Sequence, residues 1–214
     1  MIETAGLKFI IPGLIIVIGL ALIAAGKDSI IILVLAIIMA IITLFLIFFY
    51  RNPIREIPEG DNIILSIADG TVLSVCDFEN EYIGKGKKVS IFLSVLDVHI
   101  NRIPISGRID YVKYNPGKFF KAFVDKASEE NEHTEIGIIF SSGKLIFKQI
   151  AGILARRIVC RLEKDQTVAA GQIFGLIHFG SRAELFVPSN ADVIVKAGDK
   201  VKGGETIIAR IKGI

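Results

Sequence analysis

The sequence Val168-Ala-Ala-Gly-Gln-Ile-Phe-Gly175 recurs 33 residues later as Val201-Lys-Gly-Gly-Glu-Thr-Ile-Ile-Ala209. Each copy follows an aspartate and places apolar residues on both sides of a glycine, which is typical of a strand, a turn and a second strand. Paired units of this kind build barrel-sandwich domains, the architecture of lipoyl and biotinyl carriers. Chance similarity is the alternative, because Val-x-x-Gly is a common hairpin sequence. We predict a mainly β domain of the barrel-sandwich type.

The residues upstream of this repeat also favour strands. Short runs rich in Ile, Val and Phe are bounded by Gly, Pro, Asn and Asp, and helical periodicity is weak. The predicted strands cover residues 62–67, 70–76, 88–93, 107–114, 134–141, 144–150 and 158–161. We therefore expect one β domain over residues 62–214, preceded by a linker at 51–61.

Two uncharged apolar runs, residues 9–26 and 30–50, precede this linker. At about 1.5 Å per residue, the second run spans the hydrocarbon core of a bilayer, which is roughly 30 Å thick. The N-terminus lacks the basic region and the cleavage site of a signal peptide, and neither run has the charged face of a buried core helix. We predict a transmembrane helical hairpin over residues 1–50, with Asp28 or Ser29 capping the second helix.

Charge and cysteine content bear on the membrane orientation of the chain and on its possible partners. Arg51 and Arg55 follow the second run, so the positive-inside bias predicts a cell-membrane protein whose β domain lies on the cytoplasmic side. Cys76 and Cys160 have apolar neighbours and fit no metal-site spacing, so we expect buried free thiols and no metal. The formal net charge of +3, without a basic stripe, gives no reason to expect a nucleic-acid partner.

The stretch His178-Phe-Gly180-Ser181-Arg182 lies between two apolar runs. A Gly-Ser pair in a loop carries little information by itself. Here a tight turn at the glycine could hold the serine hydroxyl against the preceding carbonyl, since glycine adopts strained backbone conformations readily.

Several segments, in order along the chain, resemble the phosphatidylserine decarboxylase family in its short form, which includes archaetidylserine decarboxylase-like proteins. These are residues 48–55 (FFYRNPIR), 68–72 (ADGTV), 96–107 (LDVHINRIPISG), 149–157 (QIAGILARR) and 179–182 (FGSR). One such segment would be weak evidence, whereas the ordered set covers nearly all of residues 48–190.

The resemblance implies that the chain cuts itself between Gly180 and Ser181. Ser181 would attack the Gly180 carbonyl, and β-elimination and hydrolysis would convert Ser181 into a covalent pyruvoyl cofactor. Residues 1–180 and 181–214 would stay associated after cleavage, within a possible homo-oligomer. The pyruvoyl group would accept the electrons released when a serine phospholipid of the bilayer, phosphatidylserine or archaetidylserine, loses carbon dioxide to give the ethanolamine phospholipid.

The resemblance also assigns roles to single residues. Asp69 matches the aspartate of self-cleavage, although an Asp-Gly turn between strands is a common structural arrangement. His99 matches the histidine of decarboxylation, a proton donor or substrate stabiliser; a satisfied core histidine is the alternative. Arg102 stands where longer members carry a second histidine, and arginine cannot act as a base. Either His99 covers both steps, or Asp69 acts on Ser181 while Arg102 orients its carboxylate.

Four arginines are candidates for binding the phosphate or carboxylate of the substrate, since a guanidinium suits either group. They are Arg102, Arg156, Arg157 and Arg182, for which salt bridges at strand edges are the alternative. We expect His178 to be structural, although it lies close to Ser181 in sequence. Two other functions stay open: a membrane-tethered lipoyl- or biotinyl-carrier-like adaptor, and a pyruvoyl decarboxylase of a soluble amino acid, which the hairpin disfavours.

Overall fold

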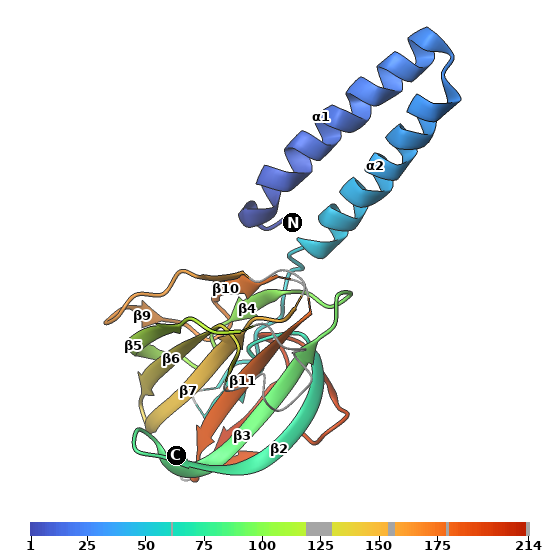
Figure 1. The fold of residues 1–214 in the computed structure, drawn as a ribbon. Coiled ribbons are helices and arrows are strands. Elements are labelled where there is room, and N and C mark those ends of the chain that lie inside the picture. The colour runs from blue at the N-terminus through green and yellow to red at the C-terminus, as the bar shows by residue number, and fades with distance from the viewer. Residues whose placement is uncertain (61, 119–129, 154–156, 179, 213–214) are drawn as a thin grey trace. The chain divides into compact units, whose positions relative to one another are not determined.

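The computed structural model describes residues 1–60, 62–118, 130–153, 157–178 and 180–212 (Figure 1). The chain divides into two compact units, Met1–Ile54 and Arg55–Ile214. The first unit contains helices α1 (Thr4–Lys27) and α2 (Ile30–Phe49).

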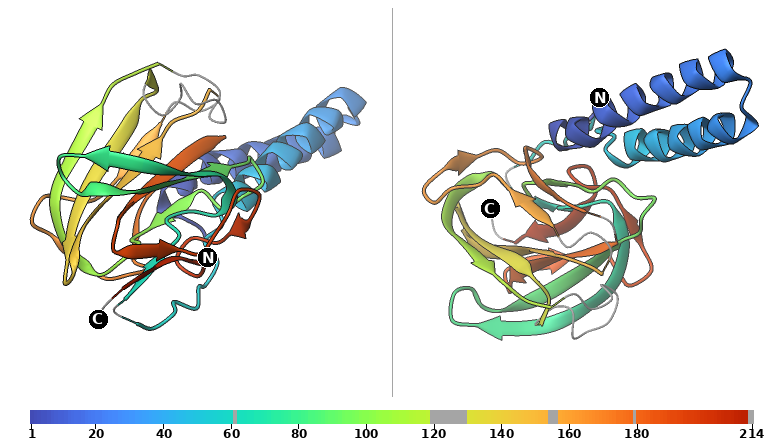
Figure 2. Two further views of the ribbon diagram at one scale, coloured as in Figure 1. Left: turned by 90° about the horizontal axis from the view of Figure 1, so that it is seen from below. Right: turned by 45° about the horizontal axis from the view of Figure 1, so that its top comes forward.

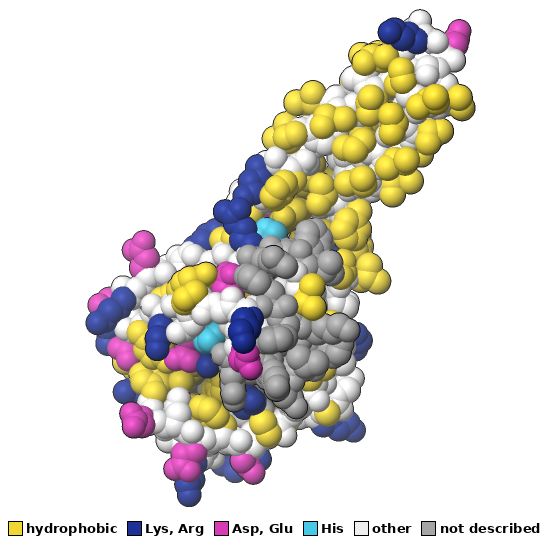
Figure 3. Space-filling model, in the orientation of Figure 1, with side chains coloured by type: hydrophobic (Ala, Val, Ile, Leu, Met, Phe, Trp, Pro, Cys, Tyr) yellow, Lys and Arg dark blue, Asp and Glu magenta, His cyan; other side chains and the backbone are white. Residues whose placement is uncertain are grey.

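The two helices of the first unit are apolar on all sides. Each is long and apolar enough to cross a membrane, and most of their large apolar side chains are exposed, as the yellow surface in Figure 3 shows. A soluble helix pair would instead present a polar face. Gly6 permits close packing, because a Cβ there would lie 2.4 Å from Tyr50 Cγ. Ser29 is the N-cap residue of α2, but its side chain makes no capping hydrogen bond.

The second unit contains the strands. They are β1 (Ile63–Leu65), β2 (Gly70–Asn80), β3 (Gly84–Leu93), β4 (Ile100–Arg102), β5 (Gly107–Asn115), β6 (His133–Phe140), β7 (Gly143–Ile150), β8 (Ile158–Cys160), β9 (Thr167–Val168), β10 (Ile173–Ile177), β11 (Ser181–Pro188), β12 (Ala191–Val193), β13 (Lys200–Val201) and β14 (Ile207–Ile211). Within the described residues, eight of them form one sheet in the order β13-β2-β3-β11-β7-β6-β5-β9. Two smaller sheets have the orders β1-β14-β12 and β4-β10-β8.

The prediction of a mainly β domain behind an apolar helical hairpin is confirmed. The large sheet curls into half a barrel, which is visible in both views of Figure 2. Figure 1 shows β4 and β10 lying across the end of this sheet at which β11 begins. The small sheet therefore closes the half-barrel over the N-terminus of β11.

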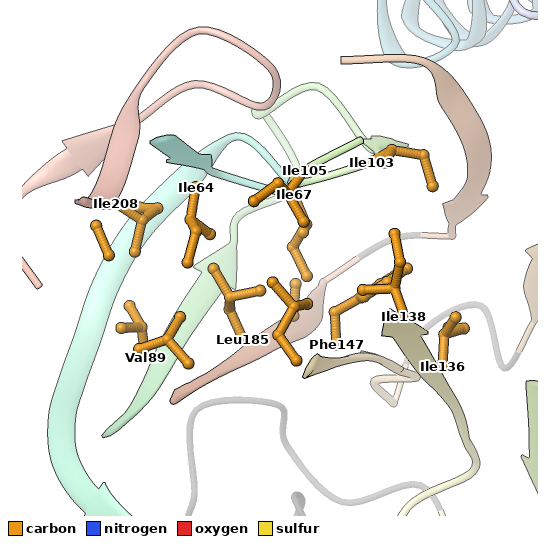
Figure 4. Close-up of a cluster of buried hydrophobic side chains, with 14 of the residues drawn as sticks. Ile64, Ile67, Val89, Ile103, Ile105, Ile136, Ile138, Phe147, Leu185 and Ile208 are labelled. Carbon is orange, nitrogen blue, oxygen red and sulfur yellow. The ribbon is translucent and has the colours of Figure 1, made fainter. Parts of the chain in front are cut away.

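The hydrophobic core lies between the large sheet and the smaller ones. Figure 4 shows Val89, Leu185 and Phe147 of the large sheet facing Ile64 and Ile103 from the other side. All five side chains are 0% exposed. Along β11 the core residues recur at every second position, as expected for a strand with one face on the core.

The hairpin of β2 and β3 is longer than predicted. The prediction ended β2 at residue 76 and began β3 at residue 88, because the residues between them are polar. Cross-strand charge pairing extends the ladder, with Lys87 Nζ 2.8 Å from Asp77 Oδ1. Asn80 Oδ1 then caps the turn by accepting a hydrogen bond from the Ile83 N–H at 2.9 Å. Cys76 is the last residue of the predicted strand and is exposed, and Cys160 is half-buried, so the expectation of two buried thiols was wrong.

Both copies of the sequence repeat form a strand, a glycine turn and a second strand, as predicted. The glycines of the two turns, Gly171 and Gly204, have positive φ angles of 76° and 78°. A side chain at either position would meet Ile57, and a Cβ on Gly204 would lie 3.6 Å from the Gly171 Cα. The two turns therefore pack against each other, and both positions require glycine.

The chain segments that pair with the two repeats are also equivalent to each other. Residues 65–72 contact the second copy in the same way as residues 102–109 contact the first. In the strand ladders, Gly70 pairs with Val201 as Gly107 pairs with Val168. At the turns, the Gly204 N–H donates to the Ser66 carbonyl as the Gly171 N–H donates to the Ile103 carbonyl. The two segments also bond to each other, with the Leu65 N–H donating to the Pro104 carbonyl and the Arg102 N–H to the Ile67 carbonyl. An approximate two-fold relationship thus organises this part of the domain.

Candidate functional site

Ser181 is the first residue of β11, a central strand of the large sheet. It pairs with Leu93 at the end of β3, and its side chain is completely buried on the same face as Ala183. The Ser181 Oγ has no hydrogen-bond partner among the residues that the structure describes. Gly180 precedes it with a φ of 62°, a left-handed conformation that would cost a residue with a Cβ roughly 1 kcal/mol or more. A buried, unsatisfied hydroxyl after a constrained turn is uncommon and points to chemistry.

His99 lies at the same end of the large sheet. Its carbonyl accepts a hydrogen bond from the Ile177 N–H at 3.2 Å, so His99 is held beside the strand that leads into Ser181. The imidazole is 1% exposed, and its Nδ1 lies 2.9 Å from the Asp97 carbonyl oxygen. Because a carbonyl can only accept, Nδ1 carries the proton and the lone pair of the neutral ring lies on Nε2. This tautomer can take a proton at Nε2.

Asp69 precedes β2, and both of its carboxylate oxygens are held. The Gly203 N–H donates to Oδ1 at 2.8 Å, and Arg55 Nη2 donates to Oδ2 at 2.7 Å. The Arg55 side chain is only 6% exposed, and its Nη1 also lies 3.5 Å from Glu205 Oε1. Asp69 is therefore fixed in place by a buried ion pair with the residue that begins the second unit.

Burial raises the pKa of the Asp69 carboxyl above its ordinary value. The hydrogen bond from Gly203 and the charge of Arg55 act in the opposite direction, whereas the charge of Asp97 raises the pKa further. Asp97 belongs to the turn before His99, where its carboxylate accepts hydrogen bonds from the backbone N–H and the hydroxyl of Ser94, both at 2.7 Å. The charge of Asp97, in the turn before His99, thus acts on the Asp69 carboxyl.

The sheet order determines how far Asp69 lies from Ser181. Thr71 of β2 pairs with Phe92 of β3, which pairs with Arg182 of β11, so Asp69 and Ser181 lie near the same end of the sheet. β3 stands between β2 and β11, and strands are spaced by about 4.8 Å, which separates the two backbones by about 10 Å. Ser181, His99 and Asp69 are therefore gathered at one end of the half-barrel without Asp69 being on a strand adjacent to Ser181.

Comparison with known proteins decides the family. The family model for phosphatidylserine decarboxylase matches residues 42–209. The chain is 46% identical to the phosphatidylserine decarboxylase proenzyme of Chlorobium phaeovibrioides over 173 residues, which are 80% of this chain and 79% of the relative. It is 47% identical to the proenzyme of Syntrophus aciditrophicus over 77% of this chain and 78% of the relative. It is 48% identical to the proenzyme of Wolbachia pipientis over 79% of this chain and 76% of the relative. The chain belongs to the phosphatidylserine decarboxylase family.

Membership in the phosphatidylserine decarboxylase family makes the chain a carboxy-lyase, as the sequence predicted. It also directs attention to Arg102, where the longer members of the family were expected to have a second histidine. Arg102 Nη1 donates to the Gly171 carbonyl at 3.0 Å, whereas Arg55 Nη2 lies 2.7 Å from Asp69 Oδ2. Arg102 thus supports the glycine turn of the first repeat, and Arg55 holds the Asp69 carboxylate.

The other arginines predicted for substrate binding differ in their surroundings. Arg182 is 1% exposed and lies on the face of β11 opposite to Ser181, where its Nη2 donates to Ser90 Oγ at 2.9 Å and its Nε lies 3.1 Å from Glu184 Oε1. Arg157 is exposed, and Arg156 lies outside the described residues. These contacts indicate that Arg182 links β11 to β3 through Ser90, and its role in substrate binding stays a prediction.

Of the other two histidines, His178 is buried and lies three residues before Ser181 in sequence. Its Nδ1 lies 3.0 Å from the Arg157 carbonyl oxygen, which also accepts the His178 N–H. His133 begins β6 and is half-buried, and its Nδ1 lies 2.8 Å from the Asn131 carbonyl oxygen. The contacts of His178 are consistent with the expected structural role.

Sequence reasoning missed Arg55 as part of the site. It lies within the quoted segment at residues 48–55, but it was used there only to orient the hairpin. Its pairing with Asp69, 14 residues away, depends on the path of the linker, which no local pattern reveals. The one feature of the sequence that could have indicated Arg55 is that a basic residue stands within a segment that resembles the family.

Proposed function

We propose that the chain is the precursor of a pyruvoyl-dependent enzyme that cuts itself between Gly180 and Ser181. Ser181 carries the proposal, because its buried hydroxyl lacks a hydrogen-bond partner in the described part of the chain and directly follows a glycine in the left-handed conformation. The relatives support it, since their names describe them as proenzymes.

The residues of the chain can perform the cleavage in the following order. The Ser181 Oγ attacks the Gly180 carbonyl carbon, and its proton passes to His99 Nε2. The C–N bond between the two residues then breaks, the nitrogen takes up a proton, and an ester results. Loss of the Ser181 Cα proton expels Gly180 as a carboxylate and leaves dehydroalanine, whose hydrolysis releases ammonia and yields the pyruvoyl group. A pyruvoyl group at residue 181 supplies an electron sink for the loss of a carboxylate.

In this proposal Asp69 supports the proton transfer by its charge. Its carboxylate interacts with Asp97, whose carbonyl orients the His99 ring. A fixed anion near this turn favours the imidazolium that forms when His99 accepts the proton. Arg55 and the Gly203 N–H keep the carboxylate in position.

We propose that the substrate is a serine phospholipid, which is converted into the ethanolamine phospholipid and carbon dioxide. The relatives are named for phosphatidylserine. The apolar hairpin agrees with a substrate confined to a bilayer, because it would hold the β domain at the membrane surface. We also propose that this domain faces the cytoplasm, since the basic residues Arg51 and Arg55 follow the second apolar run and cytoplasmic flanks carry an excess of Lys and Arg.

Mass analysis of the full-length protein in detergent tests the proposal. We expect two chains, residues 1–180 and 181–214, with a blocked and ketone-reactive N-terminus on the shorter one. Ser181→Ala should stay in one piece and be inactive. An active wild-type preparation that consists of one uncut chain would overturn the mechanism.

Three substrates then distinguish the possible lipids. Diacyl phosphatidylserine, isoprenoid archaetidylserine and free serine should be compared in the same detergent. Carbon dioxide release from at least one lipid, and far less from free serine, is the expected result. Preferential turnover of free serine would identify a decarboxylase of a soluble amino acid instead.

A further inference from the structure

Two buried amide side chains lie in the core of the half-barrel and bond to each other. Gln149 and Asn101 are both 0% exposed, and Gln149 Nε2 donates to Asn101 Oδ1 at 2.8 Å. Gly175 provides the space, since a Cβ there would lie 3.0 Å from Gln149 Nε2. Gln149 Nε2 is also 3.3 Å from the Val159 carbonyl oxygen, so the Gln149 amide is held in one orientation.

The outer atoms of this pair have no hydrogen-bond partner within the described part of the chain. Asn101 Nδ2 and Gln149 Oε1 make no hydrogen bond to any residue that the structure describes. An unsatisfied buried polar atom costs about 1–3 kcal/mol. Apolar residues would fill this position without that cost. The pair therefore presents a donor and an acceptor that no described residue of the resting chain satisfies.

The register of the large sheet places this pair next to the cleavage position. Gln149 of β7 lies directly opposite Ala183 of β11, with both side chains on the core face. Ser181 lies two residues before Ala183 and therefore on the same face, diagonal to Gln149 at roughly 7 Å between Cβ atoms. The Ser181 Oγ is a further buried polar atom here that makes no hydrogen bond to the described residues.

Asn101 is connected to the same site through its own strand. It follows His99 by two residues, and successive side chains of an extended chain alternate between faces. His99 and Asn101 therefore project from the same side of this segment. β4 thus brings a proton acceptor and an amide donor to the end of the sheet where Ser181 lies.

We propose that Asn101 Nδ2 donates a hydrogen bond to the oxyanion formed at Gly180 during self-cleavage, and that Gln149 is the residue that positions Asn101. This inference rests on the self-cleavage proposed above. When Ser181 Oγ bonds to the Gly180 carbonyl carbon, the electron pair of the carbonyl moves to its oxygen, and the serine proton passes to His99 Nε2. The negative oxygen is stabilised by a fixed hydrogen-bond donor, and the buried Asn101 amide, held by Gln149, is such a donor.

The rate of cleavage in three variants tests this assignment. Asn101→Asp keeps the oxygen that accepts from Gln149 but removes the donor. Asn101→Ser is smaller but retains a donor. Thr134→Val is the matched control, because Thr134 is 3% exposed and pairs with Gln149 on the side away from β11. Each precursor is refolded or translated in detergent, and cut protein is followed on denaturing gels while thermal unfolding reports the fold.

We expect Asn101→Asp to slow cleavage by about 10²-fold or more, Asn101→Ser to slow it less, and Thr134→Val to cleave as the wild type does. Hydroxylamine, which cuts the ester, should release less fragment from Asn101→Asp than from the wild type at early times. Cleavage of Asn101→Asp at the wild-type rate would overturn the proposal, as would equal slowing in Thr134→Val.

A further variant and the behaviour of the wild type separate a loss of the donor from misfolding and from the absence of self-cleavage. Should the added charge of Asn101→Asp prevent folding, Asn101→Leu removes the donor without a charge, and equal cleavage rates of Asn101→Leu and Asn101→Ser would overturn the role of the donor. A wild-type chain that never cuts would refute the self-cleavage itself, which separates the failure of the proposed function from the failure of this inference.

Discussion

Asp69 and Ser106 occupy equivalent positions in the two-fold arrangement of the β domain. Each precedes the glycine that begins a strand, and each accepts a hydrogen bond from a turn of the opposite repeat: the Gly203 N–H to Asp69 Oδ1 at 2.8 Å, and the Ala170 N–H to Ser106 Oγ at 2.9 Å. A serine is sufficient for this contact in one half. The carboxylate in the other half, with its buried partner Arg55, therefore exceeds what the turn requires and favours a role in the chemistry.

Asp69→Ser should separate the structural role of this position from its charge. We expect the variant to fold, because the serine can accept the Gly203 N–H as Ser106 accepts the Ala170 N–H. Self-cleavage should slow by at least about 10-fold, since the anion that supports His99 is gone. Gel analysis of cleavage over time, together with the thermal unfolding midpoint, measures both effects.

Ser106→Asp is the matched control for this variant. Ser106 is exposed and lies in the half of the structure without the cleavage site, so a carboxylate there should leave the cleavage rate unchanged. Wild-type cleavage in Asp69→Ser would show that residue 69 only holds the turn.

The pH dependence of stability should reveal the buried carboxylate. Burial raises the pKa of Asp69 above its ordinary value of 3.8 in the folded chain, so the folded state binds a proton that the unfolded state has already lost. The resulting stabilisation is present below the unfolded pKa and is lost as the pH rises through the folded pKa. In a Ser181→Ala background, Asp69→Asn should therefore be more destabilising at pH 4 than at pH 7.

Arg55→Gln should raise the pKa of Asp69 further. The charge of Arg55 lowers the pKa of Asp69, so its removal should move the folded pKa further up and extend the pH range over which stability falls. Unfolding by urea in detergent at several pH values measures both variants. A difference between Asp69→Asn and its parent that is constant with pH would contradict the raised pKa.

Much of the fold could be predicted from local patterns. Runs rich in Ile, Val and Phe with turn residues at their ends indicated strands such as β6 and β7, and two uncharged runs of sufficient length indicated the helical hairpin. Those signals are local because side-chain periodicity follows directly from strand and helix geometry. The repeat at Val168 and Val201 was visible for the same reason, since both copies need a glycine at the same place in the turn.

The contacts of the site could not be predicted in this way. Asn101 and Gln149 are 48 residues apart, and their pairing depends on the register between strands of different sheets. The partner segments of the repeats share little beyond Gly70 and Gly107, because backbone hydrogen bonds make their equivalence. Ser181 was found only through the resemblance of its surroundings to a family.

His99→Gln tests which steps need the imidazole. The amide can occupy similar space but cannot accept a proton at neutral pH, so decarboxylation should fall by about 10²-fold or more. We also expect slow self-cleavage, because the lone pair of the neutral ring lies on Nε2. Normal cleavage with lost decarboxylation would instead assign the base of self-cleavage to another group, with Asp69 the first candidate. His133→Gln, at a half-buried histidine on β6, is the control that should keep both activities.

The short chain should stay bound after cleavage, because β11 is a central strand. Eight of its residues pair with β3 and five pair with β7, and Leu185 is fully buried in the core. We expect residues 1–180 and 181–214 to elute together from a sizing column in detergent and to separate only in guanidinium. Leu185→Ala should weaken this association by about 2–5 kcal/mol and lower the guanidinium concentration that releases the short chain. Ile194→Ala, at a residue of the same chain that is 55% exposed, should leave that concentration unchanged. Release of the short chain without denaturant would show that the peptide bond at residue 180, rather than the sheet, holds β11 in the domain.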